Sequence, residues 1–356
     1  MTLTIGILEG DDIGLEVVPE CVKVMKQAAS RTKLDIDWQP VPIARKAHEL
    51  LGHTVPPGTL ERLQSLDGWL LGPIGHREYP KGDPTWVNAH PLFRLHFGLY
   101  ANYKPFVSYP NLPSLHKDID LLFLRETTEG FKVDGNLFKG YGEFMPVQGM
   151  AIGICVTTEL KSRLIAEAAF EAARLRPRRK VTAVHKNTVY RYGDELFAQE
   201  CRKVAAKNPD IAFEEVIVDT FAMRLVMKPQ QYDVIVTTNL YGDILTDEAA
   251  GLIGGLGLAP GLNASERIAM GQATHGSAPD IAGKDIANPY AMIMSGKMLL
   301  EWLGTKRNEP KAHEAAVLIE SAMRKVIAES RHLTRDLGGN AGTREMGDAV
   351  ARAIEA

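Results

Sequence analysis

Two aspartates, Asp243 and Asp247, lie four residues apart in the segment 239–247 (NLYGDILTD), directly after the apolar run 232–238. The apolar run predicts a buried strand that leads into a helix, and the spacing places both carboxylates on one helical face. Carboxylates this close repel each other unless a cation lies between them, and oxygen ligands at the end of a strand suit Mg²⁺ or Mn²⁺. The alternative is a pair of solvated first-turn acids favoured by the helix dipole. Spacing alone leaves both interpretations open.

A third acid and a lysine follow two further apolar runs. Asp219 comes after a β-rich run, where a lone aspartate is most often a helix N-cap. Lys186 follows the strand-like residues Val184 and His185. A lysine at a cleft edge beside carboxylates and a metal can have a depressed pKa and act as a base. The alternative for Lys186 is an ordinary exposed lysine, and the alternative for His185 is a structural rather than a catalytic role.

Three cations could hold an acidic substrate. Arg94 and Lys104 flank the segment 95–103, and Arg125 stands at the end of the apolar run 119–124. Arginine suits bidentate capture of a carboxylate, although any one of these residues could be a surface charge.

A loop rich in glycine and small residues covers 275–284 (HGSAPDIAGK) and has neither the GxGxxG nor the Walker spacing. Its small residues would let backbone N–H groups approach a phosphate or an adenine closely. An ordinary Pro/Gly turn is the alternative.

Strand-like and helix-like runs alternate along the chain and must position these residues. The predicted strands are 2–8, 68–71, 119–124 and 232–238, and the predicted helices are 14–30, 161–174, 243–251, 289–303 and 313–330. This alternation predicts an α/β fold with substantial parallel sheet. The segment 131–150 differs, because it is rich in glycine and aromatic residues without helical periodicity. We expect a β-arm that packs on something, such as another subunit, rather than a disordered loop.

The composition excludes several classes of protein. The 356 residues suggest about two domains, and a net charge of −3 argues against dedicated nucleic-acid binding, which only the short basic segment 174–180 (RLRPRRK) would favour. Three scattered cysteines give no disulfide framework and fit a reducing cytoplasm. We expect no signal peptide and no membrane span, and hence a cytoplasmic protein.

Taken together, these segments resemble the β-decarboxylating dehydrogenase family, and the resemblance runs from GDDIG at 10–14 to TRDLGG at 334–339. Its most specific parts are the segments 239–247 and 275–289 (HGSAPDIAGKDIANP). This family comprises isopropylmalate, isocitrate, homoisocitrate and tartrate/D-malate dehydrogenases. The resemblance implies a two-domain α/β fold with a cofactor site unlike the Rossmann fingerprint. It implies a discontinuous cofactor-binding domain (1–100 plus 255–356), a substrate and dimerisation domain (101–254), and an active site in the cleft between them. The arm at about 131–150 would be exchanged in a homodimer.

The resemblance also implies roles for individual residues. Mg²⁺ or Mn²⁺ would bind Asp219, Asp243 and Asp247, Lys186 would act as the base, and Lys186 and Asp219 would reach into the partner's active site. Arg94, Lys104 and Arg125 would clamp the carboxylate that leaves as CO₂. The cofactor would be NAD rather than NADP, because Asp280 followed by Ile281 stands where NAD-using members have an acid and a small aliphatic residue. The implied cofactor-binding residues are Ile13, Ile74, His275, Gly276, Ser277, Ala278, Pro279, Asp280, Ile281 and Asn288.

Several positions depart from the family pattern. Lys104 stands where arginine is usual, and Asp12 and Asp285 replace customary glycines. Lys132 occupies the position of the catalytic tyrosine that protonates the enol carbon after decarboxylation. Three interpretations follow: Lys132 is the proton donor, Tyr141 substitutes for it, or the final protonation is impaired.

The substrate and the activity also have open alternatives. The segment 86–93 would contact the substituent on C3 of the substrate, and Asn88 and His90 there favour a polar or small group over isopropyl. The resemblance predicts NAD-dependent oxidation and decarboxylation of a (2R)-2-hydroxy di- or tricarboxylic acid. The alternative, motivated by Lys132 and Lys104, is a catalytically impaired paralogue that binds metabolites and regulates a partner.

Overall fold

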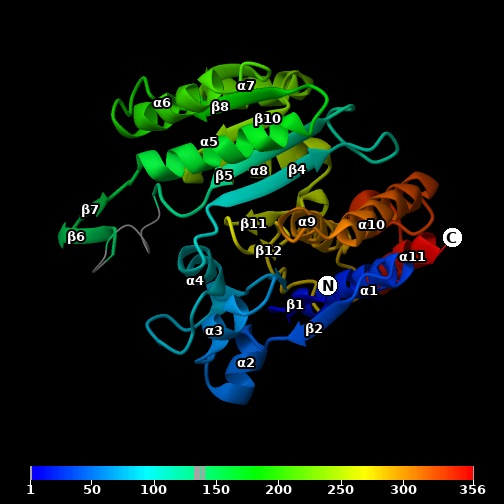
Figure 1. The fold of residues 1–356 in the computed structure, drawn as a ribbon. Coiled ribbons are helices and arrows are strands. Elements are labelled where there is room, and N and C mark those ends of the chain that lie inside the picture. The colour runs from blue at the N-terminus through cyan, green and yellow to red at the C-terminus, as the bar shows by residue number, and fades with distance from the viewer. Residues whose placement is uncertain (1, 132–136, 138–140, 356) are drawn as a thin grey trace. The chain divides into compact units, whose positions relative to one another are not determined.

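The computed structural model describes residues 2–131, 137 and 141–355, and these form two compact units. The first unit comprises residues 1–97, 109–115 and 254–356, and the second comprises 98–108 and 116–253. The predicted α/β fold with a largely parallel sheet is confirmed (Figure 1). Within the described ranges, no helix has the length and apolar character needed to cross a membrane.

In the described part of the first unit, five strands pair in the order β2-β1-β3-β12-β11; the β11–β12 pair is antiparallel and the β1–β2, β1–β3 and β3–β12 pairs are parallel. Its strands are β1 (Leu3–Leu8), β2 (Ile36–Pro40), β3 (Gly68–Leu71), β11 (Leu262–Ala264) and β12 (Ala269–Gly271). Its helices are α1 (Gly14–Thr32), α2 (Ala44–Leu51), α3 (Thr59–Gln64), α4 (Ala89–His96), α9 (Tyr290–Lys306), α10 (Pro310–Glu329) and α11 (Thr343–Glu355). Helices α1, α9, α10 and α11 pack side by side although they come from the two ends of the chain (Figure 1).

Residues 109–115 belong to the first unit because they pack against helices from the end of the chain. The Tyr109 and Tyr290 hydroxyls are hydrogen-bonded at 2.9 Å, and Asn111 Nδ2 donates to the Ile327 carbonyl at 2.5 Å. On β3, the fully buried Trp69 meets Phe93 of α4 edge to face, with ring centroids 6.2 Å apart. Buried aromatic contacts of this kind fix α4, which carries the predicted substrate residues His90 and Arg94 and is capped by a third, Asn88.

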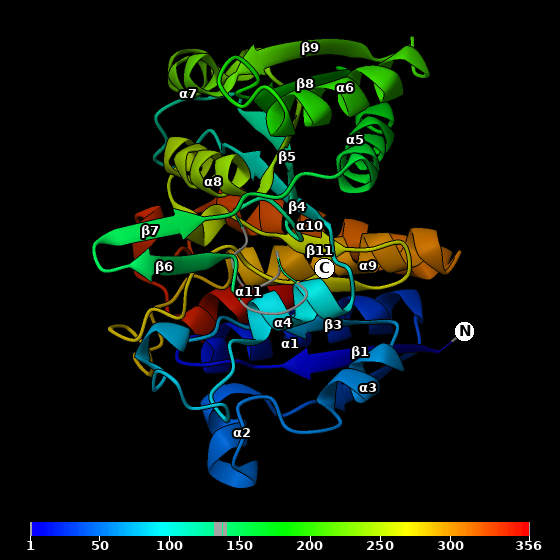
Figure 2. The same ribbon diagram turned by 90° about the vertical axis from the view of Figure 1, so that its left-hand side faces the viewer.

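Among the described residues of the second unit, five strands pair in the order β4-β5-β10-β8-β9, and within this sheet the β4–β5 pair is antiparallel. These strands are β4 (Ala101–Val107), β5 (Asp120–Glu126), β8 (Lys180–His185), β9 (Ala212–Ile217) and β10 (Val234–Thr237). Its helices are α5 (Glu159–Arg174), α6 (Gly193–Ala206), α7 (Val218–Met227) and α8 (Asn239–Ile253). Helices α5 and α6 cover one face of these strands and α7 and α8 the other (Figure 2).

Apolar side chains of α5, α6 and the central strands build the core of the second unit. Ile165 and Phe170 of α5 and Phe197 of α6 pack against Val181 and Val236, all of them almost fully buried. Strands buried on both faces read as continuous apolar runs, which is why these strands could be predicted from the sequence.

A hairpin, β6 (Glu143–Val147) and β7 (Met150–Gly153), overlaps the predicted arm, and every residue of its two strands is exposed. Paired hydrogen bonds between Gly130 and Val156, at 2.8 and 3.0 Å, close the base of the segment. Residues 132–136 and 138–140 lie outside the described residues. The exchange of this arm in a dimer stays a prediction.

Candidate active site

Four polar residues of the second unit lie at or directly after the carboxyl ends of its parallel strands. Arg125 lies at the end of β5, Lys186 follows β8, Asp219 follows β9 and Asn239 follows β10. The register pairs Thr237 of β10 with Arg125 of β5 and with Val184 of β8, so the four ends share one edge of the sheet. Ligands of open α/β sheets bind at this edge.

Arg125 lies against the start of α8 and is held by three hydrogen bonds. Its Nε and Nη2 donate to Asn239 Oδ1 at 3.1 and 2.7 Å, and its Nη1 donates to Asp243. The close fit depends on Gly242, because a Cβ at that position would lie 2.6 Å from Cγ of Arg125. Burial lowers the pKa of Arg125, and the charge of Asp243 opposes this effect.

Lys104 approaches the same helix from β4. It is buried and donates from Nζ to Thr246 Oγ1 at 2.9 Å. Its charge also favours the ionised form of Asp247. Two of the three predicted clamp residues, Lys104 and Arg125, are therefore brought together on α8. The third, Arg94, lies in the last turn of α4 in the first unit.

Asp243 and Asp247 lie in α8, which begins at Asn239, four residues before Asp243. The interpretation of both as first-turn acids is therefore wrong, because the first turn of α8 holds no acid. The pKa of Asp247 is raised, mainly by burial and further by the negative charge of Asp243. A cation between the two carboxylates would relieve that repulsion, so this pair of oxygen ligands fits Mg²⁺ or Mn²⁺.

Lys186 and Asp219 form a second pair, in which Nζ of Lys186 donates to Oδ1 of Asp219. The N-cap interpretation of Asp219 is wrong, because Ile217 is the N-cap of α7 and Asp219 lies in its first turn. The hydrogen bond from Lys186 holds the pKa of Asp219 below its usual range. His185, in contrast, is buried against Glu215 at 3.0 Å, as its structural interpretation predicts.

The three predicted metal ligands do not form one cluster in a single chain. Among the described residues, no group of three or more His, Cys, Asp or Glu side chains is placed to hold a metal ion. Asp243 and Asp247 are together on α8, whereas Asp219 of α7 is paired with Lys186, which follows β8. Lys132, the departure from the family pattern, lies outside the described residues, and Tyr141 is 66% exposed.

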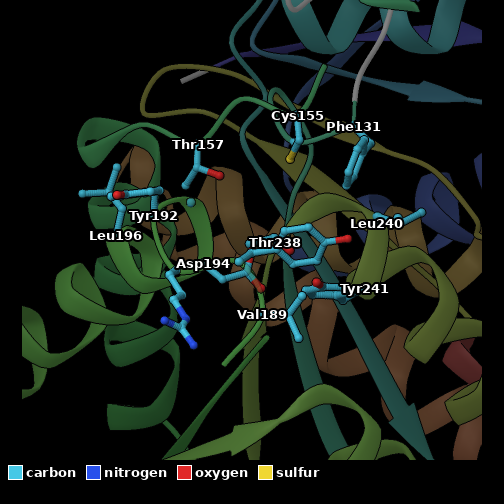
Figure 3. Close-up of a pocket in the computed structure, with 14 residues that line it drawn as sticks. Phe131, Cys155, Thr157, Val189, Tyr192, Asp194, Leu196, Thr238, Leu240 and Tyr241 are labelled. Atoms are coloured by element: carbon cyan, nitrogen blue, oxygen red, sulfur yellow. The ribbon is translucent and has the colours of Figure 1, made fainter. Parts of the chain in front are cut away.

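A pocket of about 480 Å³ lies within the second unit, and Asp194, Leu240 and Tyr241 are among its lining residues (Figure 3). Asp194 stands in it, accepting the backbone N–H of Lys186 at 2.5 Å and bonding the Tyr241 hydroxyl. The other lining residues are mostly apolar or aromatic: Gly130, Phe131, Cys155, Thr157, Val189, Tyr190, Arg191, Tyr192, Gly193, Leu196, Thr238 and Leu240. Sequence reasoning missed this pocket, because its walls come from four separate segments and share no motif.

The predicted substrate residues of the first unit lie on α4. Asn88 is its N-cap and accepts the backbone N–H of His90 at 3.1 Å. His90 Nε2 lies 2.7 Å from Gln272 Nε2, and burial lowers the pKa of His90 to about 3. His90 is therefore neutral near pH 7, and Gln272 is a neighbour that the sequence did not indicate.

The predicted cofactor loops of the first unit meet at the ends of β1 and β3. The backbone N–H of Asp11 donates to the Pro73 carbonyl at 2.8 Å, which places Ile13 near the loop that carries Ile74. The N–H of Ile13 in turn donates to the Ser277 carbonyl at 3.1 Å. Three segments from distant parts of the sequence are thus joined by backbone hydrogen bonds.

Within the glycine-rich loop, Gly276, Pro279 and Asp280 are exposed. His275 Nε2 is buried without a hydrogen-bond partner among the described residues. A buried polar atom left in this state normally requires a partner, so the loop fits a bound ligand such as NAD. Asn288 is engaged within the protein, donating to Asp336 at 2.8 Å and accepting the N–H of Tyr290 at 2.9 Å.

Two departures from the family pattern have a local explanation. Asp12 (φ 52°) and Asp285 (φ 54°) both adopt the left-handed conformation, in which the customary glycine is unstrained. Aspartate tolerates this conformation better than most residues, because its short side chain bonds locally. Asp12 accepts from Arg45 at 2.7 Å, and Asp285 accepts the N–H of Arg344 at 3.1 Å.

The basic segment 174–180 is used within the second unit. Arg176 binds Asp233 at 2.5 Å and Asp120 at 2.8 Å, and Arg178 donates to the Gln230 carbonyl at 2.8 Å. The arginines of this segment therefore bind residues at or just before the starts of β5 and β10.

The model of the isocitrate/isopropylmalate dehydrogenase family matches residues 4–350. The chain belongs to this family. It is similar to 3-isopropylmalate dehydrogenase of Saccharolobus solfataricus (38% identity, 98% of this chain and 99% of that protein). It is also similar to the mitochondrial NAD isocitrate dehydrogenase subunit alpha of Bos taurus (37% identity, 99% and 90%). A solved structure of isocitrate dehydrogenase from Methylococcus capsulatus matches with a TM-score of 0.87 at 37% identity and covers 99% of this chain and 100% of that chain.

Proposed function

We propose that this protein catalyses the NAD-dependent and Mg²⁺- or Mn²⁺-dependent oxidation and decarboxylation of a (2R)-2-hydroxy di- or tricarboxylic acid. The observation that carries the proposal is the arrangement on α8, where Asp243 and Asp247 share one helix face with the buried cations Arg125 and Lys104 against it. Carboxylates for a metal beside cations for a substrate carboxylate suit a chelated hydroxy acid. The similarity to isopropylmalate and isocitrate dehydrogenases supports this reaction class.

Asp219, Asp243 and Asp247 would hold the metal ion, which supplies Lewis-acid stabilisation of negative charge on the substrate oxygen. Arg125, Lys104 and Arg94 would bind the carboxylate that leaves as CO₂. Lys186 would take the hydroxyl proton, through Asp219 or a water molecule, as a general base. The hydrogen bond between Lys186 and Asp219 supports this route.

The active site would be shared between two chains of a homodimer. Lys186 and Asp219 of one chain would complete the site of Asp243 and Asp247 on the other. The separation of the acids into two groups within one chain supports this arrangement, as does the wholly exposed hairpin β6–β7.

We infer NAD rather than NADP as the cofactor. The exposed carboxylate of Asp280, followed by Ile281, would accept hydrogen bonds from the adenosine ribose and repel a 2′-phosphate. We expect Asp280→Lys to shift the ratio of kcat/KM for NAD⁺ to that for NADP⁺ by at least about tenfold towards NADP⁺. An unchanged ratio would contradict this assignment.

The substituent on C3 of the substrate would face Asn88 and His90, which favour a small or polar group. Neutral His90, held beside Gln272, supports hydrogen bonding to a hydroxyl or a carboxylate more than contact with isopropyl. The proton donor after decarboxylation would be Lys132, or Tyr141 in its place. A cytoplasmic location stays a prediction.

The test is the formation of NADH with Mn²⁺ and a panel of D-malate, tartrate, isopropylmalate, isocitrate and homoisocitrate, with CO₂ assayed in parallel and EDTA as the control. We expect NADH and CO₂ in equal amounts with one acid. NADH without CO₂ would indicate that the protein oxidises the acid without decarboxylating it. If the wild type forms no NADH with any acid but Lys132→Tyr does, then Lys132 alone impairs an otherwise complete enzyme. If both are silent but a panel acid binds, the regulatory paralogue is the better description.

A further inference from the structure

Asn239 contacts two parts of the candidate active site at once. Its Oδ1 accepts from Nε and Nη2 of Arg125 at 3.1 and 2.7 Å, and its Nδ2 donates to the Glu129 carbonyl at 2.7 Å. The two contacts fix the orientation of the amide, because a flipped amide would place a donor against the guanidinium and an acceptor against the carbonyl. Asparagine and glutamine are the residues that carry both groups on one side chain.

The contact with Arg125 determines which edge of the guanidinium is available to a ligand. Asn239 occupies the side edge, formed by Nε and Nη2. The aliphatic part of Arg125 is confined by Gly242, where an added Cβ would lie within 2.6–3.0 Å of three of its carbons. The end edge, formed by Nη1 and Nη2, faces away from Asn239. In this structure Nη1 donates to Asp243, and the remaining N–H groups of this edge can bind a second acceptor.

The contact with Glu129 holds the loop that follows β5. Within this loop, Glu126 accepts the N–H groups of Thr128 and Glu129, each at 2.8 Å, and Gly130 adopts φ 89°. A Cβ at Gly130 would lie 3.0 Å from Cβ of Asn239, so the loop packs directly on this residue. In the sequence, Phe131 and Lys132 come next.

We propose that Asn239 is a positioning residue, which presents the end edge of Arg125 to the leaving carboxylate of the substrate and ties Arg125 to the loop that leads to position 132. The inference rests on the proposed function for the identity of the ligand. Asn239 itself touches no reacting atom in this assignment and acts through Arg125 and the Glu129 carbonyl.

The chain offers a matched control in Asn208. Its Oδ1 also accepts from an arginine, Arg174, and its Nδ2 also donates to a backbone carbonyl, that of Val204 at 2.8 Å. Asn208 is buried between α6 and the start of β9, whereas Asp219 follows the opposite end of that strand. Asn208→Ala therefore removes the same chemistry without touching Arg125.

The test compares Asn239→Ala, Asn239→Asp and Asn208→Ala with wild type. Phenylglyoxal labelling of Arg125, mapped by mass spectrometry with Arg176 as the internal reference, reports whether the guanidinium is held. We expect faster labelling at Arg125 in Asn239→Ala only. In Asn239→Asp the acceptor remains but the donor is lost, so Arg125 stays protected while hydrogen exchange at Glu129 and Gly130 accelerates. Unchanged labelling in Asn239→Ala, or unchanged exchange in Asn239→Asp if the alanine variant does not fold, would overturn the proposal.

Turnover supplies a second readout. With the acid identified from the panel, we expect Asn239→Ala to raise the KM for the acid about 10- to 100-fold, the range for loss of a hydrogen bond to a charged group. The KM for NAD⁺ should change less than about twofold, and the ratio of CO₂ to NADH should fall. Equal changes in both KM values, or the same changes in Asn208→Ala, would indicate a structural effect and overturn the proposal. Labelling and exchange need no turnover, so a wild type that reduces no NAD⁺ defeats only the proposed function.

Discussion

The two halves of the candidate active site differ in how firmly the chain holds them. The side chain of Arg125 is 10% exposed and has hydrogen bonds to Asn239 and Asp243. Asp219, in contrast, is 65% exposed and is bound to Lys186 alone among the side chains of the described residues. A buried group with several bonds is preorganised, whereas an exposed ion pair contributes little and reorients easily. This difference supports the proposal that the Lys186 half acquires its final geometry from a second copy of the chain.

The largest expected effect tests the sharing of the site. Lys186→Met and Asp243→Asn should each lower kcat by about 10²–10⁴-fold, the usual range for loss of an acid–base group. If two chains share each site, a mixed dimer of the two variants contains one intact site. An equimolar mixture should then recover roughly a quarter of wild-type activity, since half of the dimers of a twofold-symmetric protein are mixed.

The control for this experiment is Lys180→Met. Lys180 binds Glu214 at 2.9 Å at the other end of β8, and its side-chain exposure of 27% is close to the 26% of Lys186. We expect this variant to keep wild-type kcat. A mixture of Lys186→Met and Asp243→Asn that recovers no activity, although each protein is dimeric by sedimentation, would place the whole site in one chain.

A second prediction tests the preorganisation of the α8 half. Gly242→Ala places a methyl group against the aliphatic part of Arg125, and overpacking of this kind should lower the free energy of unfolding by about 1–3 kcal/mol. Gly251→Ala, in the same helix, meets nothing within 4 Å and should stabilise by about 0.5–1 kcal/mol through helix propensity. Urea denaturation measures both. If Gly242→Ala has the same free energy of unfolding as Gly251→Ala, or a higher one, the side chain of Arg125 is free to move aside.

A third and smaller expected effect is a pH dependence of the free energy of unfolding that arises from Glu129. Burial raises the pKa of Glu129 from its ordinary value of 4.5 to about 7, so ionisation destabilises the folded state. This penalty is absent below about pH 4.5, grows as the pH rises and is complete above about pH 7. Glu129→Gln should therefore gain about 1–2 kcal/mol relative to wild type between pH 4.5 and pH 8, discounted for partial exposure.

Melting temperatures of wild type and Glu129→Gln across this range measure the gain. Asp219→Asn is the contrasting control, because the lowered pKa of Asp219 keeps it ionised from pH 5 to pH 8. Its difference from wild type should not change with pH. A constant difference for Glu129→Gln would mean that Glu129 is solvated in the folded protein.

Much of the fold could be predicted from apolar runs and helical periodicity, because buried parallel strands and long helices leave a strong local signal. The predicted strand 68–71 coincides with β3, and the predicted helix 161–174 differs from α5 by two residues. The start of α8 was missed by four residues. The segment Asn239–Gly242 contains Asn and Gly, which favour loops locally, and contacts with Arg125 override that preference.

The contacts of the candidate site were less accessible from the sequence. Arg125, Lys186, Asp219 and Asp243 follow strands and could be nominated, but their partners depend on the strand order β5-β10-β8-β9. Asn239 opens the distinctive segment 239–247, but nothing in that segment indicates its hydrogen bond to Glu129, which is 110 residues away in the sequence. Long-range pairs of this kind are set by topology and not by spacing.

The discontinuity of the first unit has a consequence for synthesis of the chain. Strand β3 pairs with β12, yet residues 1–97 emerge from the ribosome before the whole of residues 116–253. About 200 residues separate β3 from β12, and at 5–20 residues per second their synthesis takes about 10–40 s. During that interval the apolar strand β3 has an open edge, which is a template for pairing with other chains. The translation speed of the middle of the message therefore controls how long the beginning of this protein is exposed to aggregation.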